Sequence, residues 1–440
     1  MIRIPLRSHV LGLFLLALLT SAGLYTSTAQ AADTYQLTVV TDREDALYEV
    51  GQEAKFLISV TKNGQPAQGL EVSYVVDDFL SGGAYPSGTL TLDGKPAVVV
   101  AKASKPVFLR CTVTINGEKK ITTIAGAGFA PLKIKPSLPA PKDFDKFWAD
   151  QKEQLAAVPA KAQLTAVPQN DDTIVCFDVQ VDCTGGAPVS GYFGKPKAAK
   201  PKSLPAVLWV HGAGVRGSSL SNAVKGAKSG MLSMDINAHG IANGKPGAFY
   251  QELSAGRLKG YPHSGNDSRD TTYFRGMFLR LVRAIDFLTA QPEWDGKTIA
   301  VIGHSQGGGQ ALVAGGIDDR VTFIASGVPA ICDHSGRAAG RINGWPKLVP
   351  TGKDGTPAAA ELQAGRYVDA VNFASRCKAD AIMSVGFIDR TCPPSSCYAA
   401  YNLLQGNKQV INKPLMGHAA PADIQTAFFD AILKHVEDQK

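Results

Sequence analysis

Residues 298–316, TIAVIGHSQGGGQALVAGG, decide the fold of this chain. The segment opens with the apolar run 299–302, typical of a strand buried on both faces, and its residues 310–314 predict the start of a helix. Between them, residues 303–307 (Gly-His-Ser-Gln-Gly) match G-x-S-x-G, the sharp strand–turn–helix connection that exposes a nucleophilic serine, here Ser305. Glycines are needed because a Cβ beside so tight a turn would clash. In a chain with 45 glycines the motif alone is weak, so its setting has to decide.

The chain around this motif alternates strands and helices, as a parallel sheet with crossover helices requires. Further buried strands are expected at residues 204–210, 231–236, 321–326, 381–388 and 410–415. Helices are expected to start within residues 142–148 and to span residues 273–289, 367–375 and 422–436. Two leading strands, 173–181 and 188–195, are expected to form an antiparallel edge. The pattern predicts a doubly wound α/β domain of the α/β-hydrolase type over residues 142–440.

Residues 33–129 show short alternating strands separated by Asn-Gly and Asp-Gly turns. The expected strands are 35–41, 54–61, 70–76, 89–92, 97–101, 107–115 and 120–124. This spacing predicts a small all-β sandwich of immunoglobulin-like type. The segment has no Trp and only scattered Tyr and Phe, which favours a spacer or interface role over sugar binding. A Gly- and Pro-rich joint follows over residues 126–141, with a stiff linker at 130–141.

The N-terminus has the pattern of a targeting segment. Arg3 and Arg7 precede the apolar run 10–19, and residues 29–31 (Ala-Gln-Ala) form a cleavage site, so residues 1–31 are predicted to be a signal peptide. The mature protein is expected to be exported, to the periplasm or beyond, without a membrane anchor. Removing the two arginines lowers the formal net charge from +7 to +5, which is too small and too scattered to predict nucleic-acid binding.

Seven cysteines in an exported chain allow disulfides, and their odd number leaves at least one thiol free. The spacing offers Cys176 with Cys183, and Cys392 with Cys397, as local pairs, which only geometry can decide. No C-x-x-C pair and no H-E-x-x-H occurs, so neither a metal site nor another cofactor is expected.

A serine becomes a nucleophile when a neighbouring base accepts its proton, and in this architecture an acid and a histidine follow it along the chain. His418 comes directly after the last expected strand, whereas His435 lies within the terminal helix. Asp389 stands at the end of the strand expected at 381–388, whereas Asp380 stands at its beginning, at the opposite edge of the sheet. Ser305, Asp389 and His418 are therefore the predicted catalytic triad.

Two backbone N–H groups are expected to bind the negative charge that forms on the substrate oxygen. Gln306, which follows the nucleophile, supplies one. The loop 211–214 (His-Gly-Ala-Gly), directly after an early strand, supplies the other through Ala213. His211 is expected to shape this loop rather than to titrate in the reaction.

One motif suggests a different function. Residues 212–217 match G-x-G-x-x-G, and Asp235 ends the next strand at the distance of a ribose-binding acid. A dinucleotide site would leave Ser305, Asp389 and His418 unexplained, and export separates the chain from cytosolic nicotinamides. The hydrolase hypothesis is therefore preferred.

Several motifs resemble the acetyl xylan esterase/cephalosporin-C deacetylase family of carbohydrate esterases. They are GHSQGGG at 303–309, FIDRTCPPS at 387–395, YAAYN at 398–402 and GH at 417–418, with further similarity in DFDKFW at 143–148 and LVRAI at 281–285. The resemblance covers about residue 141 to the C-terminus. It implies a serine esterase that removes acetyl groups from carbohydrates, with the triad and oxyanion donors named above, and it leaves a homo-oligomer open.

The chain departs from that family at three places. Residues 237–240 (Asn-Ala-His-Gly) replace the usual Arg-Gly-Gln, Ala419 replaces the glutamate that usually follows the histidine, and the N-terminal β region is additional. The polar insertion 332–363, with Trp345, is expected either to wall the acyl pocket or to be a surface loop.

Three other functions fit part of the pattern. A general short-chain carboxylesterase would share the triad. So would a prolyl-oligopeptidase-like peptidase, although about a hundred N-terminal residues are too few for the propeller of such enzymes. A non-catalytic binding protein with a hydrolase fold would not need the complete triad.

Overall fold

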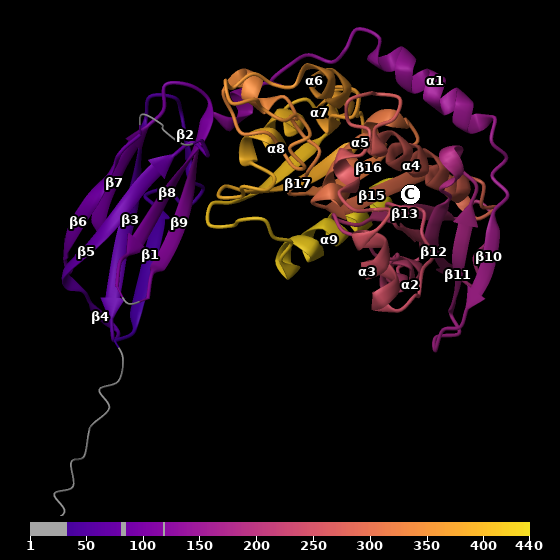
Figure 1. Ribbon diagram of the computed structural model, residues 1–440. Helices are drawn as coiled ribbons and strands as arrows, with labels where there is room; N and C mark the ends of the chain where they lie inside the picture. The colour runs from indigo at the N-terminus through magenta and orange to yellow at the C-terminus, as the bar shows by residue number, and fades with distance from the viewer. Residues whose placement is uncertain (1–32, 81–84, 118) are drawn as a thin grey trace, which may run out of the picture.

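The computed structural model describes residues 33–80, 85–117 and 119–440, so the predicted signal peptide lies outside the described residues (Figure 1). The N-terminal part contains only strands: β1 (Tyr35–Thr41), β2 (Leu47–Tyr48), β3 (Glu53–Lys62), β4 (Gln65–Pro66), β5 (Gln68–Asp77), β6 (Ser87–Asp93), β7 (Ala97–Lys102), β8 (Val107–Ile115) and β9 (Ile121–Phe129). Strand β3 pairs with β1, β4 and β7 in one sheet, and a second sheet has the order β2-β9-β8-β5-β6. The two sheets enclose a core of their own, which includes Phe56, Val72, Val113 and Phe129.

Strand β9 is longer than the sequence predicts. It continues from Ile121 to Phe129, so Gly126 and Gly128 belong to the sheet and not to the joint expected to begin at residue 126. The residues after β9 pack onto the C-terminal part of the chain. The Ser137 N–H donates to Asp333 Oδ1 at 3.0 Å. The Pro139 carbonyl accepts a 2.8 Å hydrogen bond from Arg366 Nη2.

The rest of the chain is built on one mixed sheet with the order β10-β11-β12-β14-β13-β15-β16-β17-β18. Its strands are β10 (Gln163–Val167), β11 (Ile174–Val181), β12 (Val189–Pro196), β13 (Leu204–Val210), β14 (Leu232–Ile236), β15 (Trp294–His304), β16 (Phe323–Gly327), β17 (Asp380–Gly386) and β18 (Lys408–Lys413). Strands β13 to β18 run parallel, and β10 to β12 form an antiparallel edge. The sequence predicts two strands at that edge and misses β10.

Helices cover both faces of this sheet, as the doubly wound prediction requires. They are α1 (Phe144–Ala156), α2 (Leu220–Lys228), α3 (Gly247–Ala255), α4 (Tyr273–Thr289), α5 (Gln306–Ile317), α6 (Ala359–Gly365), α7 (Ala370–Ala374), α8 (Pro394–Tyr401) and α9 (Ala422–Asp438). Leu208 and Val301 face a core shared with α4 and α5, whereas their neighbours Val207 and Ile302 face the core under α9. The strands are thus buried on both sides, which explains their continuous apolar runs. Across the described residues, no helix has both the length and the apolarity to cross a bilayer.

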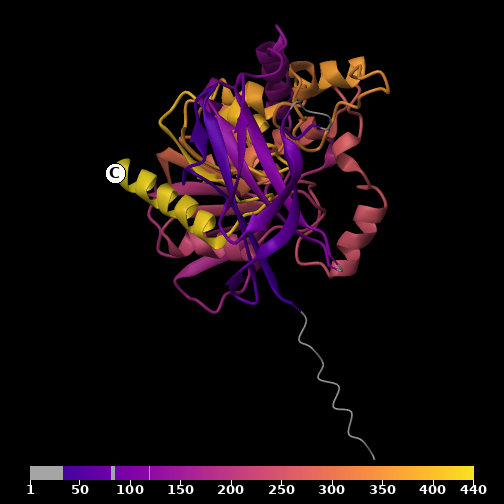
Figure 2. The same ribbon diagram turned by 90° about the vertical axis from the view of Figure 1, so that its left-hand side faces the viewer.

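The N-terminal strands lie beside the end of the mixed sheet that carries β17 and α8 (Figure 1), and they stand in front of it in the perpendicular view (Figure 2). Phe108 of β8 joins the two parts. Its ring lies 4.9 Å from the Phe387 ring and 5.4 Å from the Tyr398 ring, and it belongs to the main core of the C-terminal part. The N-terminal part therefore contributes an aromatic side chain directly to that core.

All seven cysteines are buried free thiols. The two local pairs that the spacing offers, Cys176 with Cys183 and Cys392 with Cys397, are not disulfide-bonded in this structure.

Candidate active site

Ser305 occupies the turn between β15 and α5, with φ 58° and ψ −121°. A non-glycine residue with positive φ is strained, and surrounding hydrogen bonds hold it in place. Its N–H donates to the Gly327 carbonyl at 2.8 Å, and its carbonyl accepts the Ala330 N–H at 2.9 Å. A Cβ at Gly307 would lie 2.2 Å from the Val210 carbonyl oxygen, so only glycine lets α5 approach the sheet this closely.

The structure brings the three predicted triad residues into one hydrogen-bonded chain. His418 Nε2 lies 2.8 Å from Ser305 Oγ, and His418 Nδ1 lies 2.7 Å from Asp389 Oδ2. Asp389 is completely buried, and its other oxygen accepts the N–H groups of Thr391 at 2.8 Å and Cys392 at 3.0 Å. These contacts fix the carboxylate so that it accepts a hydrogen bond from Nδ1–H, which leaves Nε2 free to accept a proton from the serine.

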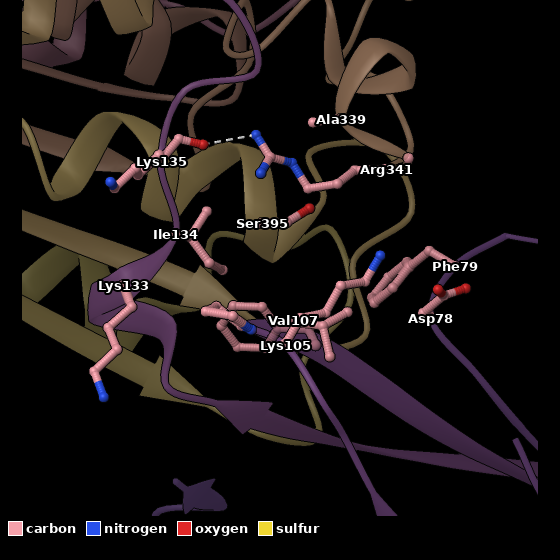
Figure 3. Close-up of a pocket in the computed structure, with 13 residues that line it drawn as sticks. Asp78, Phe79, Lys105, Val107, Lys133, Ile134, Lys135, Ala339, Arg341 and Ser395 are labelled. Carbon is pink, nitrogen blue, oxygen red and sulfur yellow. Dashed lines mark hydrogen bonds between the residues drawn. The ribbon is translucent and has the colours of Figure 1, made fainter. Parts of the chain in front are cut away.

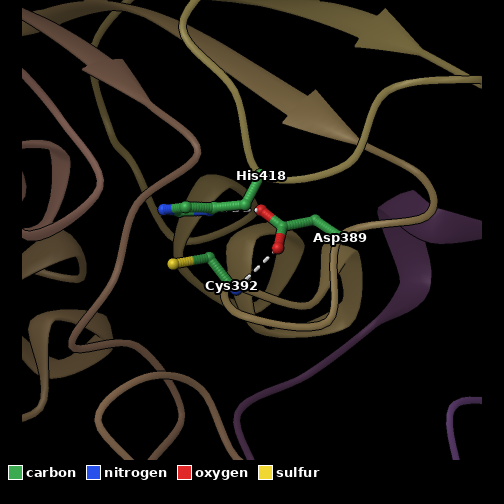
Figure 4. A group of neighbouring side chains, drawn as sticks. All are labelled: Asp389, Cys392 and His418. Atoms are coloured by element: carbon green, nitrogen blue, oxygen red, sulfur yellow. Dashed lines mark hydrogen bonds and ion pairs between the residues drawn. The ribbon is translucent and has the colours of Figure 1, made fainter.

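Cys392 is the third polar group beside His418 and Asp389 (Figure 4). The three side chains present possible metal-ligand atoms within 4.8 Å of one another. Both nitrogens of His418 already contact triad partners, so the triad itself explains this grouping. The absence of a metal cofactor stays a prediction.

The rejected candidates lie together at the other end of the sheet. His435 Nδ1 is 3.7 Å from Asp380 Oδ2, at the start of β17. Neither residue is among the contacts of Ser305, which agrees with the expectation that they lie at the opposite end of the strands from the nucleophile.

The loop 211–214 lies against the nucleophile. A Cβ built on Gly212 would be 3.5 Å from Ser305 Cβ. Among the described residues, no protein acceptor takes the N–H of Ala213 or of Gln306. The binding of an oxyanion by these two N–H groups stays a prediction.

Two histidines, the half-buried His211 and the buried His239, hold this loop in shape. His211 Nδ1 donates to the Gly212 carbonyl at 2.6 Å, and its Nε2 accepts the Ala238 N–H at 3.1 Å. His239 Nε2 donates to the Gly214 carbonyl at 3.0 Å. Burial lowers the pKa of His211 to about 3 and the pKa of His239 to about 4, so both rings are neutral near pH 7. Residues 237–240, where the family motif is missing, therefore still support the loop.

Sequence reasoning missed two further supports. Tyr261 donates its hydroxyl to Gln306 Oε1 at 2.5 Å. Arg216 donates to the carbonyls of Gly212 and Ala213, each at 3.2 Å. Arg216 stands in the G-x-G-x-x-G segment and could have been noticed there. Tyr261 lies 45 positions before Gln306, in a segment without regular periodicity, and no sequence pattern points to it.

Asp235, the acid of the dinucleotide hypothesis, is engaged within the fold. Its two oxygens accept the Ser219 N–H at 2.8 Å and the Asn222 side-chain amide at 2.7 Å. It is 2% exposed, and burial raises its pKa to about 7. Both oxygens of this aspartate thus accept hydrogen bonds from the start of α2, which argues against a ribose-binding role.

The insertion 332–363 is packed around Trp345, whereas its residues 350–356 are exposed at the surface. The Trp345 N–H donates to the Thr391 carbonyl at 3.1 Å, its own carbonyl accepts the Ile331 N–H at 2.8 Å, and its ring lies 6.4 Å from that of Phe274. The insertion thus contacts the segment that follows Asp389. Its role as a wall of the acyl pocket stays a prediction.

Comparisons with known proteins agree with this geometry. The family model for acetyl xylan esterase (AXE1) matches residues 132–434. The acetyl esterase Axe7A of Xylanibacter ruminicola is 31% identical over 391 residues, which cover 87% of each protein. That alignment is longer than the segment from residue 132 to the C-terminus, so it includes part of the N-terminal strands.

Solved structures match about two thirds of the chain. The acetyl xylan esterase from Paenibacillus sp. R4 is 29% identical with a TM-score of 0.59, and the match covers 69% of this chain and 97% of that one. Acetyl xylan esterase 1 from Thermoanaerobacterium sp. JW/SL YS485 shows the same fold, with 23% identity, a TM-score of 0.56 and the same coverage. The matches to the family model and to Axe7A show that the chain belongs to the acetyl xylan esterase family of carboxylic ester hydrolases, and the turn at Ser305 and the sheet order agree with this.

Proposed function

We propose that this protein removes acetyl groups from acetylated xylan or its oligosaccharides through an acyl-serine intermediate. Ser305 is the nucleophile, His418 the general base and acid, and Asp389 the residue that orients the imidazole. The chain of hydrogen bonds at 2.8 and 2.7 Å among these side chains is the observation that carries the proposal. The names of the relatives support the choice of an acetyl group and of xylan.

In the first half of the reaction, Ser305 Oγ attacks the acetyl carbonyl carbon while His418 Nε2 accepts the hydroxyl proton. The negatively charged oxygen of the tetrahedral intermediate accepts hydrogen bonds from the backbone N–H groups of Gln306 and Ala213. Removal of one such donor typically costs about 10²–10³ in kcat. Collapse of the intermediate breaks the bond to the sugar oxygen, which takes the proton from His418 and leaves as a hydroxyl group.

In the second half, water attacks the acetyl-serine with His418 again as the base, and acetate leaves. The Asp389 carboxylate stabilises the imidazolium that forms in each half. Its two backbone donors, at Thr391 and Cys392, keep its second oxygen occupied so that the carboxylate cannot rotate away.

Two finer proposals concern the N-terminal part. We infer that the two sheets of residues 35–129 form an immunoglobulin-like sandwich, supported by their separate core. We also infer export after cleavage near residue 31, supported by Arg3, Arg7 and the apolar run that follows. N-terminal sequencing of protein recovered outside the cytoplasm would test the cleavage site.

Hydrolysis of 4-nitrophenyl acetate by the wild type and by Ser305→Ala tests the nucleophile. We expect the variant to lose at least about 10³-fold in kcat and to resist labelling by a fluorophosphonate. Full activity in Ser305→Ala would refute the assignment. Acetate release from acetylated xylan tests the substrate. The rates of hydrolysis of a series of esters from acetate to octanoate test the preferred length of the acyl group. A flat or rising series would favour a broader carboxylesterase.

A further inference from the structure

A cavity of about 240 Å³ lies between the N-terminal strands and the C-terminal part of the chain (Figure 3). Phe79 and Lys105 line it from the N-terminal side, and Arg341 and Ser395 line it from the C-terminal side. Its volume is below the roughly 300–1,000 Å³ of sites for drug-sized ligands, which suits a single sugar unit. Four lining residues are cationic, namely Lys105, Lys133, Lys135 and Arg341, and one lining residue, Asp78, is acidic. Arg341 and Lys133 pair with carboxylates outside the lining, those of Asp333 and Glu49. Lys105 and Lys135 have no carboxylate partner among the described residues, so the cavity keeps a positive charge that favours an anion.

Arg341 is held rigidly at this site. Its Nη2 donates to Asp333 Oδ2 at 2.6 Å, to Ser137 Oγ at 2.8 Å and to the Lys135 carbonyl at 2.9 Å, and its Nε donates to the same Asp333 carboxylate. Its side chain is only 16% exposed. All of these bonds use Nε and Nη2, so Nη1 is the nitrogen without a protein partner among the described residues. A fixed guanidinium with a free N–H edge is well suited to bind a carboxylate.

Two more donors converge with Arg341. Figure 3 shows the Ser395 hydroxyl directed toward Arg341, and the Lys105 side chain crossing the cavity from the opposite wall. Lys105 Nζ reaches to 4.0 Å from a Cβ built on Gly340, the residue before Arg341. Lys133 points away from the centre of the cavity and pairs with Glu49 at 3.3 Å. Arg341, Ser395 and Lys105 are thus the groups available to one anionic ligand.

Two short segments connect this cavity to the triad. One runs from Arg341 to Trp345, whose N–H binds the Thr391 carbonyl at 3.1 Å. The other runs from Asp389 to Ser395 at the start of α8. We propose that the cavity binds the carboxylate of a hexuronic acid unit carried by the acetylated polysaccharide, while another part of the same chain reaches Ser305. This inference rests on the proposed function and extends it to acidic substrates.

The test compares two matched substrates. One is a preparation of acetylated xylo-oligosaccharides with uronic acid branches, and the other is the same preparation with its carboxyl groups reduced to alcohols. We expect the wild type to show a KM about tenfold lower for the acidic preparation, the effect of one charge-assisted contact. Lys105→Glu should abolish this preference and Ser395→Ala should reduce it, with kcat on 4-nitrophenyl acetate unchanged. The preference should also shrink as salt is added.

Lys95→Glu is the matched control, because it makes the same charge change at an exposed lysine outside the cavity lining. It should keep the preference. Equal KM values for the two preparations in the wild type, or an equal rise for both in Lys105→Glu, would overturn the inference.

A binding measurement separates this inference from the catalytic proposal. Calorimetry with Ser305→Ala and a deacetylated, uronic acid-bearing oligosaccharide should show binding that Lys105→Glu weakens about tenfold. That result would support the cavity as a binding site even if the wild type released no acetate from either preparation. The lack of acetate release would then count only against the proposed substrate. No binding in calorimetry would count against the cavity.

Discussion

The backbone N–H of Gly126, in strand β9, donates a 3.0 Å hydrogen bond to the carbonyl of Pro414, four residues before His418. The same glycine abuts Phe387, two residues before Asp389. A Cβ at position 126 would lie 2.5 Å from Phe387 Cβ and 2.8 Å from the Phe387 carbonyl oxygen. One residue of the N-terminal strands therefore touches both segments that carry the proposed acid and base.

Gly126→Ala is expected to disturb the triad from a distance. The added methyl has no room, and overpacking of this kind destabilises by about 1–3 kcal/mol. Displacement of Phe387 should also lower kcat on 4-nitrophenyl acetate with little change in KM, because the two segments hold Asp389 and His418. Gly88→Ala is the control, since its Cβ would meet Tyr74 at an ordinary 3.5 Å. If the two variants matched in urea unfolding and in kcat, the contact would have no positioning role.

Asp389→Asn should keep the fold and lose activity. An amide cannot hold the imidazole with its proton on Nδ1, and the corresponding change in a serine protease triad lowers kcat about 10⁴-fold. The rate of fluorophosphonate labelling should fall with kcat. Asp380→Asn, at the other end of β17, should leave both quantities unchanged. A similar loss in the two variants would remove Asp389 from its proposed role.

The sequence predicts those elements whose periodicity matches their burial. Helix α4 spans Tyr273–Thr289 as expected, because its apolar residues recur at helical spacing and face the core. Strands β1 and β8 also have their predicted bounds. The residues of the proposed triad could be selected because parallel strands place their carboxyl ends at one edge of the sheet.

The sequence fails where tertiary contacts override local signals. Strand β10 escapes prediction because it is only five residues long and mostly exposed, so its alternating Leu164 and Ala166 mark no buried face. Gly126 and Gly128 predict a joint at the end of β9, whereas side chains packed against them, Phe387 and Phe108, require both glycines within the strand. The cavity at Arg341 and Lys105 joins segments more than two hundred residues apart, and no local pattern can indicate such a pair.

The seven thiols are expected to be unreactive in the native protein. All are buried, and burial raises the pKa of Cys111 to about 12 and the pKa of Cys377 to about 11. Because the thiolate is the reactive form, a thiol reagent should titrate almost none of them in buffer and all seven in guanidinium chloride. A reducing agent should leave the melting temperature unchanged. Fewer than seven thiols in the unfolded, unreduced protein would indicate a disulfide.

The histidines that support the loop 211–214 predict how stability depends on pH. Burial lowers the pKa of His239 to about 4, from about 6.5 in the unfolded chain, so the unfolded state binds the proton more readily. His239 therefore favours folding fully above about pH 6.5, and this contribution falls as the pH drops toward 4. The expected slope is about 1.4 kcal/mol per pH unit for each such imidazole.

His239→Gln should remove the contribution of this imidazole to the pH dependence of stability. A glutamine amide can still donate to the Gly214 carbonyl and accept from Tyr273, the two partners of the imidazole. Urea unfolding at pH 7 and pH 5 should show a smaller loss of stability in the variant than in the wild type, with activity at pH 7 largely kept. His263→Gln, at an exposed position, should behave like the wild type. An unchanged slope in His239→Gln would mean that the pKa of this ring is the same in the folded and unfolded states, which would contradict the prediction.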